Sequence, residues 1–149
     1  MKEVSIYIYT KYKGSLSKGS GKYHIIWETI VKDNRGIEVP KTVEHKYAVN
    51  NVTKNRLELL ALKEAFDHMK ERCRIIIYID SQYITSAVSN GWLDSWAAYG
   101  FKKKGQDIKH ADLWKEILTN MEKHEVLFLP GNKTEYSKYQ ECELRDVEL

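Results

Sequence analysis

Residues 75–83 read Ile75-Ile76-Ile77-Tyr78-Ile79-Asp80-Ser81-Gln82-Tyr83, and this stretch decides the fold class. A continuous apolar run rich in β-branched residues is typical of a central β-strand that is buried on both faces. Asp80 follows the run directly and is expected at the carboxyl end of that strand, where open α/β sheets place ligands. Asp80 could instead cap the next helix, although Ser81 could do so equally well.

The chain before this run predicts three consecutive strands. Residues 4–10 alternate β-branched and aromatic side chains, which is a strand pattern. Residues 13–21 hold three Gly and three Ser and are expected to form a loop. A second strand follows over residues 23–31, and a turn at residues 33–36 leads into a third near residues 42–49. Short connections between the three predict an antiparallel meander.

Between the third strand and the apolar run, the hydrophobic period becomes helical. From residue 54 to 70, one helical face carries the apolar residues Leu59, Leu62, Ala65, Phe66 and Met69. Glu58 lies on the same stripe, in the first turn, where the helix dipole favours a carboxylate. Its position on the core face has two explanations. Either Glu58 belongs to a functional site, or it pairs with a buried Lys or Arg.

The remaining elements complete one domain over residues 1–149. Helices are expected near residues 81–90, 112–121 and 136–147, with a last strand over residues 125–129; residues 92–99 follow the first of these helices and lead into the lysine-rich segment. The order βββαβααβα predicts an α/β fold with a five-stranded mixed sheet. Three antiparallel strands come first, parallel strands are added to them, and helices cover both faces.

Composition indicates a globular protein. The chain has 149 residues, of which 42% are hydrophobic and 30% charged. It has no apolar run near the ~20 residues that span a bilayer, so we expect a soluble, cytoplasmic protein without membrane contact. Cys73 and Cys142 are too few for a disulfide framework, and the five His show no metal-ligand spacing.

Positive charge is concentrated in two segments. Residues 4–27 hold Lys11, Lys13, Lys18 and Lys22 and no acid. Residues 99–110 hold four lysines against one acid, Asp107. Two basic segments on a chain of net charge +3 suggest a polyanionic partner. A lysine face kept for solubility explains this feature about as well.

Two motifs give the chain a resemblance to type 1 ribonuclease H. The stretch Thr53-Lys54-Asn55-Arg56-Leu57-Glu58-Leu59 resembles the family's T-x-N-R-M/A-E-L motif, and residues 79–83 resemble T-D-S-Q-Y. The resemblance implies a ribonuclease H-like fold. It also implies that Glu58 and Asp80 are catalytic carboxylates and ligands of Mg²⁺ or Mn²⁺.

A third region is similar to the basic protrusion of some family members. It comprises Trp92-x-x-x-Trp96, residues 100–104 (Gly-Phe-Lys-Lys-Lys) and residues 112–114. The resemblance implies lysines on an aromatic-anchored helical arm that grips the backbone of an RNA–DNA hybrid. The nucleic-acid-binding residues are then expected to be Lys11, Lys13, Asn55, Ser81, Gln82, Trp92, Lys102, Lys103, Lys104 and Lys109.

The first strand departs from the family pattern, which ends this strand in Asp-Gly-Ser. Here residues 9–14 read Tyr-Thr-Lys-Tyr-Lys-Gly. No shift of register supplies an acid, because residues 4–27 contain none. Lys11 could place its ammonium near Glu58 and Asp80 and compete with a metal. It could equally point to solvent from a loop.

The carboxyl-terminal part departs as well. Residues 131–134 (Gly-Asn-Lys-Thr) replace the family's G-H-x-G loop and lack its His. The family's last Asp aligns, without gaps, with Cys142. Glu141 or Glu143 could replace that Asp only through a one-residue slip, which turns a helical side chain by about 100°.

Three functions remain open. The first is a nucleic-acid-binding domain for RNA–DNA hybrid or duplex, with an incomplete two-metal site and little or no nuclease activity. The second is an active Mg²⁺- or Mn²⁺-dependent hybrid nuclease that uses Glu58, Asp80 and a carboxyl-terminal glutamate. The third is a protein-interaction domain that binds no nucleic acid. We expect a monomer, with no cofactor unless the site is active.

Overall fold

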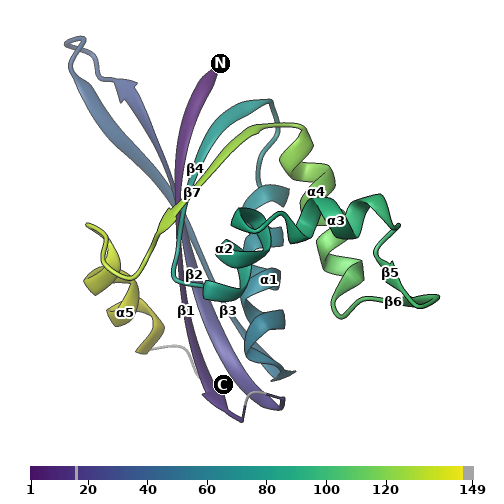
Figure 1. Ribbon diagram of the computed structural model, residues 1–149. Coiled ribbons are helices and arrows are strands. Elements are labelled where there is room, and N and C mark those ends of the chain that lie inside the picture. The colour runs from purple at the N-terminus through teal and green to yellow at the C-terminus, as the bar shows by residue number, and fades with distance from the viewer. Residues whose placement is uncertain (16, 146–149) are drawn as a thin grey trace.

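The computed structural model of the chain describes residues 1–15 and 17–145 (Figure 1). Its main sheet has five strands in the order β3-β2-β1-β4-β7. Their bounds are β1 Lys2–Gly14, β2 Gly19–Lys32, β3 Glu38–Val52, β4 Cys73–Ile79 and β7 Glu125–Pro130. β1 to β3 pair antiparallel, whereas β4 runs parallel to β1 and β7 parallel to β4. The predicted meander with parallel additions is confirmed.

Helices cover both faces of the sheet, as predicted. Their bounds are α1 Lys54–Asp67, α2 Gln82–Ser89, α3 Trp92–Ala98, α4 Ala111–Glu122 and α5 Ser137–Arg145. Figure 1 shows α1 to α4 on one side of the sheet and α5 on the other. Trp27 Nε1 donates to the Ala65 carbonyl of α1 at 3.0 Å, and on the opposite face Gln140 Nε2 of α5 donates to the Tyr7 carbonyl at 3.0 Å.

The hydrophobic core lies between the sheet and the α1 side. Alternate residues of β1, β2 and β4 point to this face, which is the expected period of a strand. Ile6, Ile25 and Ile77 are fully buried there against α1, and Trp114 of α4 is fully buried beside them. Within the described residues, no helix has both the length and the apolar character needed to span a membrane.

Several predicted boundaries were wrong, chiefly the loop over residues 13–21. β1 continues to Gly14 and β2 begins at Gly19, with Lys13 opposite Ser20. Antiparallel pairing satisfies the backbone groups of these Gly and Ser residues better than a loop does. Likewise, β3 spans residues 38–52, and α1 ends at Asp67 although its apolar period continues to Met69. Residue 147, the expected end of the last helix, lies outside the described residues.

The basic segment is a projecting hairpin rather than a helical arm. β5 (Lys102–Lys103) pairs with β6 (Gln106–Asp107) through a turn at Lys104 and Gly105. These two turn residues have φ values of 54° and 79°, the positive values that a two-residue hairpin turn requires. The short strands carry no apolar alternation, so periodicity could not reveal them. Helix α3 still supplies Trp92 and Trp96 at the base of the arm.

Candidate functional site

Strand register places Tyr9 beside Asp80. On the parallel strands β1 and β4, Ile8 is the partner of Ile79, the last residue of β4. Tyr9, which continues β1, therefore lies beside Asp80, the first residue after β4. Both residues line a pocket of about 170 Å³ with Ile8, Thr10, Gly131 and Asn132. The position where the resemblance calls for a carboxylate is therefore held by a tyrosine.

The loop after β7 closes the other side of this pocket. Gly131 lies so near β4 that a Cβ atom on it would be 2.5 Å from the Ile79 nitrogen. Only glycine fits this approach, since real Cβ atoms do not come so close to backbone atoms. The close packing brings Asn132, which stands where the family has a His, onto the pocket with Asp80.

The surroundings of Tyr9 favour the neutral form of its phenol. Partial burial raises its pKa, and the Glu141 carboxylate raises the pKa further. Arg145 opposes this change, while Asp80 adds to it. A phenol with a raised pKa keeps its proton at neutral pH, so Tyr9 brings no negative charge to the edge of the sheet.

Glu58 is buried and both of its carboxylate oxygens are engaged. Its residue exposure is only 1%. Lys54 Nζ donates to Oε1 at 2.6 Å, and the Ser81 hydroxyl donates to Oε2. The same hydroxyl accepts from the Ile84 N–H, so Ser81 is the N-cap of α2. Ser81, the residue that follows Asp80, thus connects Glu58 of α1 to the end of β4.

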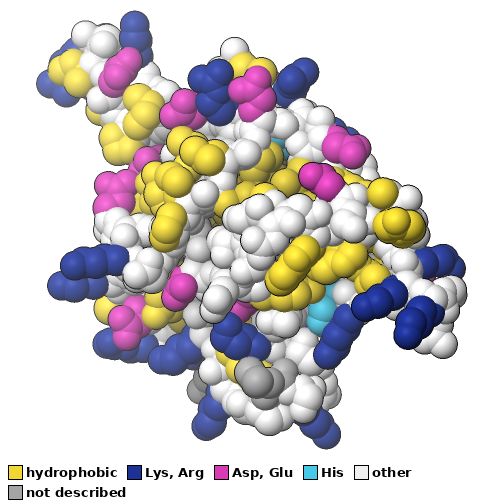
Figure 2. All heavy atoms as spheres, viewed as in Figure 1, with side chains coloured by type: hydrophobic (Ala, Val, Ile, Leu, Met, Phe, Trp, Pro, Cys, Tyr) yellow, Lys and Arg dark blue, Asp and Glu magenta, His cyan; other side chains and the backbone are white. Residues whose placement is uncertain are grey.

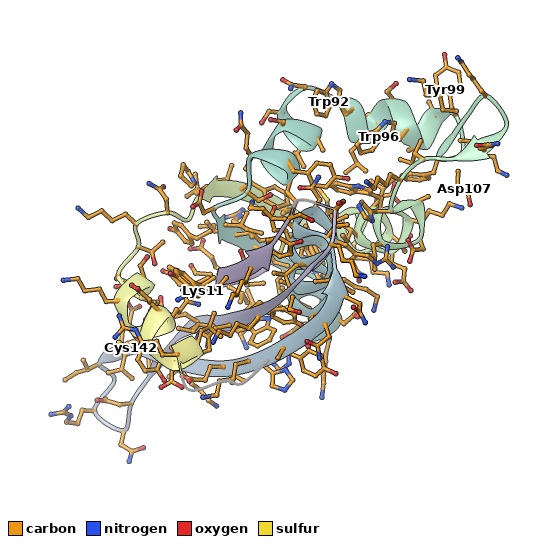
Figure 3. All side chains as sticks on the ribbon, turned by 90° about the horizontal axis from the view of Figure 1, so that it is seen from below. Lys11, Trp92, Trp96, Tyr99, Asp107 and Cys142 are labelled. Carbon is orange, nitrogen blue, oxygen red and sulfur yellow. The ribbon has the colours of Figure 1, made fainter. Side chains whose placement is uncertain are left out.

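The cation at Glu58 is Lys54, which the sequence analysis did not single out. Within the described residues, no ion pair joins Lys11 to Glu58 or Asp80. Lys11 lies on β1 with an exposed side chain, and Figure 3 shows it on the sheet, apart from the projecting arm. Lys54 is one helical turn before Glu58, and this i,i+4 spacing could have identified the pair.

The two candidate glutamates, Glu141 and Glu143, both lie on helix α5 but have different partners. Glu143 pairs with Lys46 of β3 at 3.0 Å. Glu141 pairs with Arg145 at 3.5 Å, and its carboxylate raises the pKa of Tyr9. Between them Cys142 is exposed (Figure 3). The helix is fixed by buried Gln140, whose amide also donates to the His24 carbonyl at 3.2 Å.

The residues present do not fit a pair of divalent metal ions. Within residues 1–15 and 17–145, no group of three or more His, Cys, Asp and Glu is placed to hold a metal. Magnesium requires several oxygen ligands in near-octahedral geometry. Glu58 already binds Lys54 and Ser81, and Tyr9 offers a neutral phenol. Asp80 is exposed at the strand end, and none of the described residues forms an ion pair with its carboxylate.

The basic arm, which comprises α3 and the β5–β6 hairpin, borders a second pocket. Its pocket, of about 410 Å³, is lined by Ser95, Trp96, Tyr99, Lys102, Lys103, Lys104 and Ile108. Lys102 has a weak pair with Asp107 at 3.8 Å. Figure 2 shows Lys and Arg side chains gathered at the outer end of this arm. Exposed ammonium groups next to aromatic rings are the usual means of holding a nucleic-acid strand.

A chain of aromatic rings anchors the arm to the core. The Trp92 and Trp96 ring centres are 6.5 Å apart, and Trp96 is 5.6 Å from fully buried Trp114. Trp114 Nε1 also donates to the Tyr83 hydroxyl at 2.8 Å. Three tryptophans thus connect the arm to the core.

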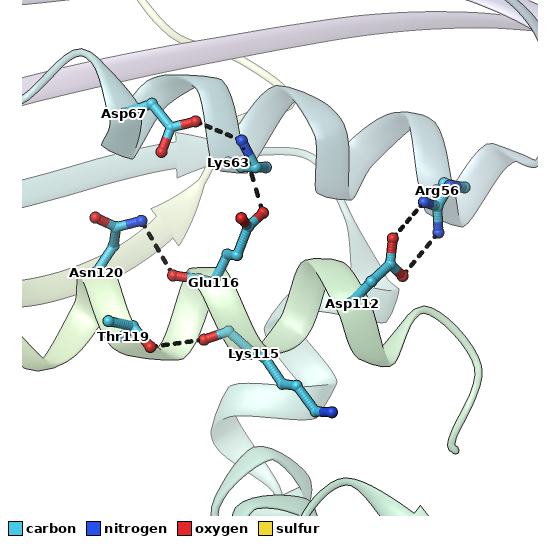
Figure 4. Close-up of polar contacts among 8 residues, drawn as sticks. All are labelled: Arg56, Lys63, Asp67, Asp112, Lys115, Glu116, Thr119 and Asn120. Atoms are coloured by element: carbon cyan, nitrogen blue, oxygen red, sulfur yellow. Dashed lines mark hydrogen bonds and ion pairs between the residues drawn. The ribbon is translucent and has the colours of Figure 1, made fainter. Parts of the chain in front are cut away.

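Arg56 links the Glu58 helix to the base of the arm. Its guanidinium binds both carboxylate oxygens of Asp112 on α4, at 2.6 and 3.2 Å (Figure 4). This bidentate contact lowers the pKa of Asp112. Lys63 also joins the two helices: it pairs with Asp67 on its own helix at 2.6 Å and with Glu116 on α4 at 3.6 Å. Arg56 in the motif thus has a structural role.

The other residues implied by the resemblance lie at scattered positions. Lys13 is exposed near the end of β1, and Lys109 is exposed just before α4. Asn55 is half-buried in the first turn of α1. Gln82 is exposed on a pocket of about 410 Å³ that also borders Asp80. Ser81 is buried, and its hydroxyl is used by Glu58 and the α2 cap.

Sequence comparison connects the chain with ribonucleases H. The family profile described as RNase H matches residues 4–131. A Ribonuclease H of Caldicellulosiruptor saccharolyticus is 33% identical over 142 residues, which cover 91% of this chain and 88% of the relative. A Ribonuclease HI of Synechocystis sp. is 32% identical over 125 residues, covering 83% and 73%.

Structural comparison supports the same fold. LC9-RNase H1, a type 1 RNase H with the type 2 active-site motif, has a TM-score of 0.73 at 24% identity; the match covers 95% of this chain and 70% of that one. The foamy viral protease-reverse transcriptase, solved in complex with RNA/DNA hybrid, has a TM-score of 0.67 at 17% identity, covering 95% and 19%. At these identities the likeness establishes the fold.

Proposed function

Because the chain belongs to the ribonuclease H family, we propose that it binds RNA–DNA hybrid or duplex through an incomplete form of the family's two-metal site. On this proposal it is weak or inactive as a nuclease. Binding uses the basic arm, and the edge of the sheet around Asp80 meets the nucleic-acid backbone without cutting it.

The proposal rests chiefly on the register that sets Tyr9 beside Asp80. Two divalent ions held about 4 Å apart repel each other and need several carboxylates between them. Here the neighbour of Asp80 is a neutral phenol, and the charge of Glu58 is matched by Lys54. The net negative charge at this edge is therefore far too small for such a pair.

The arm supports the nucleic-acid part of the proposal. Lys103, Lys104 and Lys109 are exposed, and within the described residues no carboxylate forms an ion pair with them. They are therefore free to contact phosphates, and each contact would release counterions. A foamy viral structure with the same fold was solved with RNA/DNA hybrid bound, which agrees with this use of the fold.

An active Mg²⁺- or Mn²⁺-dependent nuclease is the second candidate. Its third carboxylate is then Glu141 rather than Glu143, because Glu143 is paired with Lys46 on the far strand β3. The Glu141 carboxylate raises the pKa of Tyr9, the neighbour of Asp80. Its own partner Arg145 would have to move for Glu141 to serve a metal.

Fluorescence anisotropy of a labelled RNA–DNA hybrid, titrated with the protein across a NaCl series in EDTA, tests the proposal. Single-stranded DNA of the same sequence is the comparison ligand. We expect hybrid binding whose log Kd changes with log salt concentration by ~0.9 for each phosphate contact. Absence of hybrid binding at low salt would refute the proposal and favour a protein-interaction domain.

A further inference from the structure

Lys54 occupies the unspecified position x of the family motif T-x-N-R-M/A-E-L, and its ion pair with Glu58 indicates a role for it. We infer that Lys54 is a built-in counter-cation: its ammonium takes the place at Glu58 that a divalent metal ion needs, so that the site works without metal. The metal-binding part of this inference stands on Lys54, Glu58 and Ser81 alone. The statement about nucleic acid rests on the proposed function.

Both carboxylate oxygens of Glu58 already have a partner. Lys54 Nζ lies 2.6 Å from Oε1, and Oε2 accepts from the buried hydroxyl of Ser81. A buried carboxylate is stable only with such partners. A metal ion would have to displace the ammonium from Oε1 and then bear its repulsion at close range.

Lys54 also reaches the solvent, where its ammonium can contact a ligand. Its side chain is 48% exposed, whereas that of Glu58 is 1% exposed, so the ion pair sits at the boundary between core and solvent. An ammonium has three N–H donors, and Glu58 uses one of them. The remaining donors can reach a phosphate oxygen at the surface. Lys54 can therefore supply the positive charge that a metal would otherwise bring to a nucleic-acid backbone.

Other cations near this edge are unsuited to the role. Arg56 is bound to Asp112 on α4, and Lys63 is bound to Asp67 and Glu116. Lys11 is exposed on β1 and, within the described part of the chain, forms no ion pair with Glu58. The ammonium of Lys54 is thus the charge that neutralises the buried carboxylate.

Binding of Mn²⁺ in the absence of nucleic acid tests the inference directly. Free Mn²⁺ is measured by electron paramagnetic resonance during titration of wild type, Lys54→Gln, Lys54→Arg and Lys63→Gln. Lys63→Gln is the matched control, because it removes another i,i+4 ammonium from the same helix. We expect Lys54→Gln to bind Mn²⁺ at least about tenfold more tightly than the other three, since a repelling charge is gone.

The ligands of the gained site are checked by a second substitution. Asp80→Asn or Glu58→Gln in the Lys54→Gln background should remove the gained Mn²⁺ binding. Tight Mn²⁺ binding by the wild type that Asp80→Asn abolishes would overturn the inference, and this holds even if Lys54→Gln fails to fold. Equal Mn²⁺ affinities of wild type and folded Lys54→Gln would overturn it as well.

Hybrid binding separates this inference from the proposed function. Wild-type affinity for the hybrid should be the same in EDTA and in Mg²⁺, and Lys54→Gln should weaken binding in EDTA several-fold. Binding that requires Mg²⁺ overturns the role of Lys54 while the nucleic-acid function stands. Absence of hybrid binding refutes the proposed function, and the Mn²⁺ titrations then still decide the role of Lys54 at Glu58.

Discussion

Lys54 and Glu58 face each other across one turn of α1, with Nζ and Oε1 2.6 Å apart. The motif at residues 53–59 therefore contains both the expected carboxylate, Glu58, and the ammonium group of Lys54 that neutralises it. Beside them the register of β1 and β4 sets a tyrosine next to Asp80. The negative charge that a two-metal site needs is therefore absent at Tyr9 and neutralised at Glu58.

Restoring a carboxylate at residue 9 should restore metal binding at this edge. The register sets Tyr9 beside Asp80, and Thr10, one residue further along β1, lines the same pocket. We expect Tyr9→Asp combined with Lys54→Gln to bind Mn²⁺ more tightly than Lys54→Gln alone, by about tenfold, since a carboxylate is added at close range. Electron paramagnetic resonance of free Mn²⁺ measures the difference.

Lys11→Asp combined with Lys54→Gln is the control for that prediction, because it adds the same charge at an exposed position two residues along β1. If both double variants gain the same Mn²⁺ affinity, the charge of the surface and not the position beside Asp80 is responsible. The register argument would then be wrong.

The lysines of the arm should carry most of the salt-dependent affinity. Replacing Lys102, Lys103 and Lys104 by Ala should weaken hybrid binding and lower the slope of log Kd against log salt concentration by up to about 2.7, at ~0.9 for each lost phosphate contact. Anisotropy titrations across a NaCl series give both quantities.

The matched control replaces Lys2, Lys41 and Lys70 by Ala. These lysines line a pocket at the end of the sheet where β1 begins. This variant loses the same charge but should keep its slope within about one contact of the wild type. Equal losses in the two triple variants would show that net charge, not the arm, determines binding.

The bidentate contact between Arg56 and Asp112 should stabilise the junction of α1 and α4. Both side chains are partly exposed, so Arg56→Ala should reduce the free energy of unfolding by about 1 kcal/mol, the upper range for surface pairs. Urea unfolding measures this change. Arg74→Ala removes an exposed pair to Glu125 with a single contact and should reduce it less. An equal or larger loss for Arg74→Ala would contradict the role given to Arg56.

Stability should fall as the pH drops below about 6.5, in part because of His24. This residue is fully buried, and its Nδ1 has no hydrogen-bond partner within the described residues. Burial lowers the pKa of His24 although Glu44 acts in the opposite direction. The unfolded chain therefore binds the proton more readily, and the free energy of unfolding decreases once the pH passes below the unfolded pKa of about 6.5.

Urea unfolding at about pH 7.5 and about pH 5 measures this dependence, to which one buried His can contribute on the order of 1 kcal/mol. His24→Gln should show a smaller decrease than wild type. Exposed His45→Gln is the control and should keep the wild-type decrease. Burial also lowers the pKa values of His110 and His124, so part of the decrease should remain in His24→Gln. An unchanged decrease in His24→Gln would exclude the contribution of His24.

The sequence predicted the order and pairing of the main-sheet strands because their apolar patterns are strong. The run Ile75–Ile79 marks the central strand, and Glu58 on an apolar stripe marks a buried carboxylate. It did not predict that Tyr9 neighbours Asp80, because strand register depends on tertiary pairing between distant segments. It also left open which cation Glu58 would meet, since several lysines were available.

Polar segments were predicted least well. The Gly- and Ser-rich stretch after Lys13 reads as a loop, yet pairing of Gly14 with Gly19 continues the β-ladder almost to its turn. The β5–β6 hairpin has two residues in each strand and a turn set by Lys104 and Gly105. Neither has a hydrophobic period, and local composition alone does not distinguish such hairpins from loops.

Cleavage of an RNA–DNA hybrid by the unmodified protein tests the central claim most directly. The purified chain is incubated with end-labelled hybrid in Mg²⁺ at a concentration where anisotropy shows the hybrid bound, and the products are separated on a denaturing gel. We expect bound, intact RNA, because Tyr9 brings no negative charge beside Asp80 and Lys54 neutralises the charge of Glu58. Robust Mg²⁺-dependent cleavage by the wild type that Asp80→Asn abolishes would contradict the account.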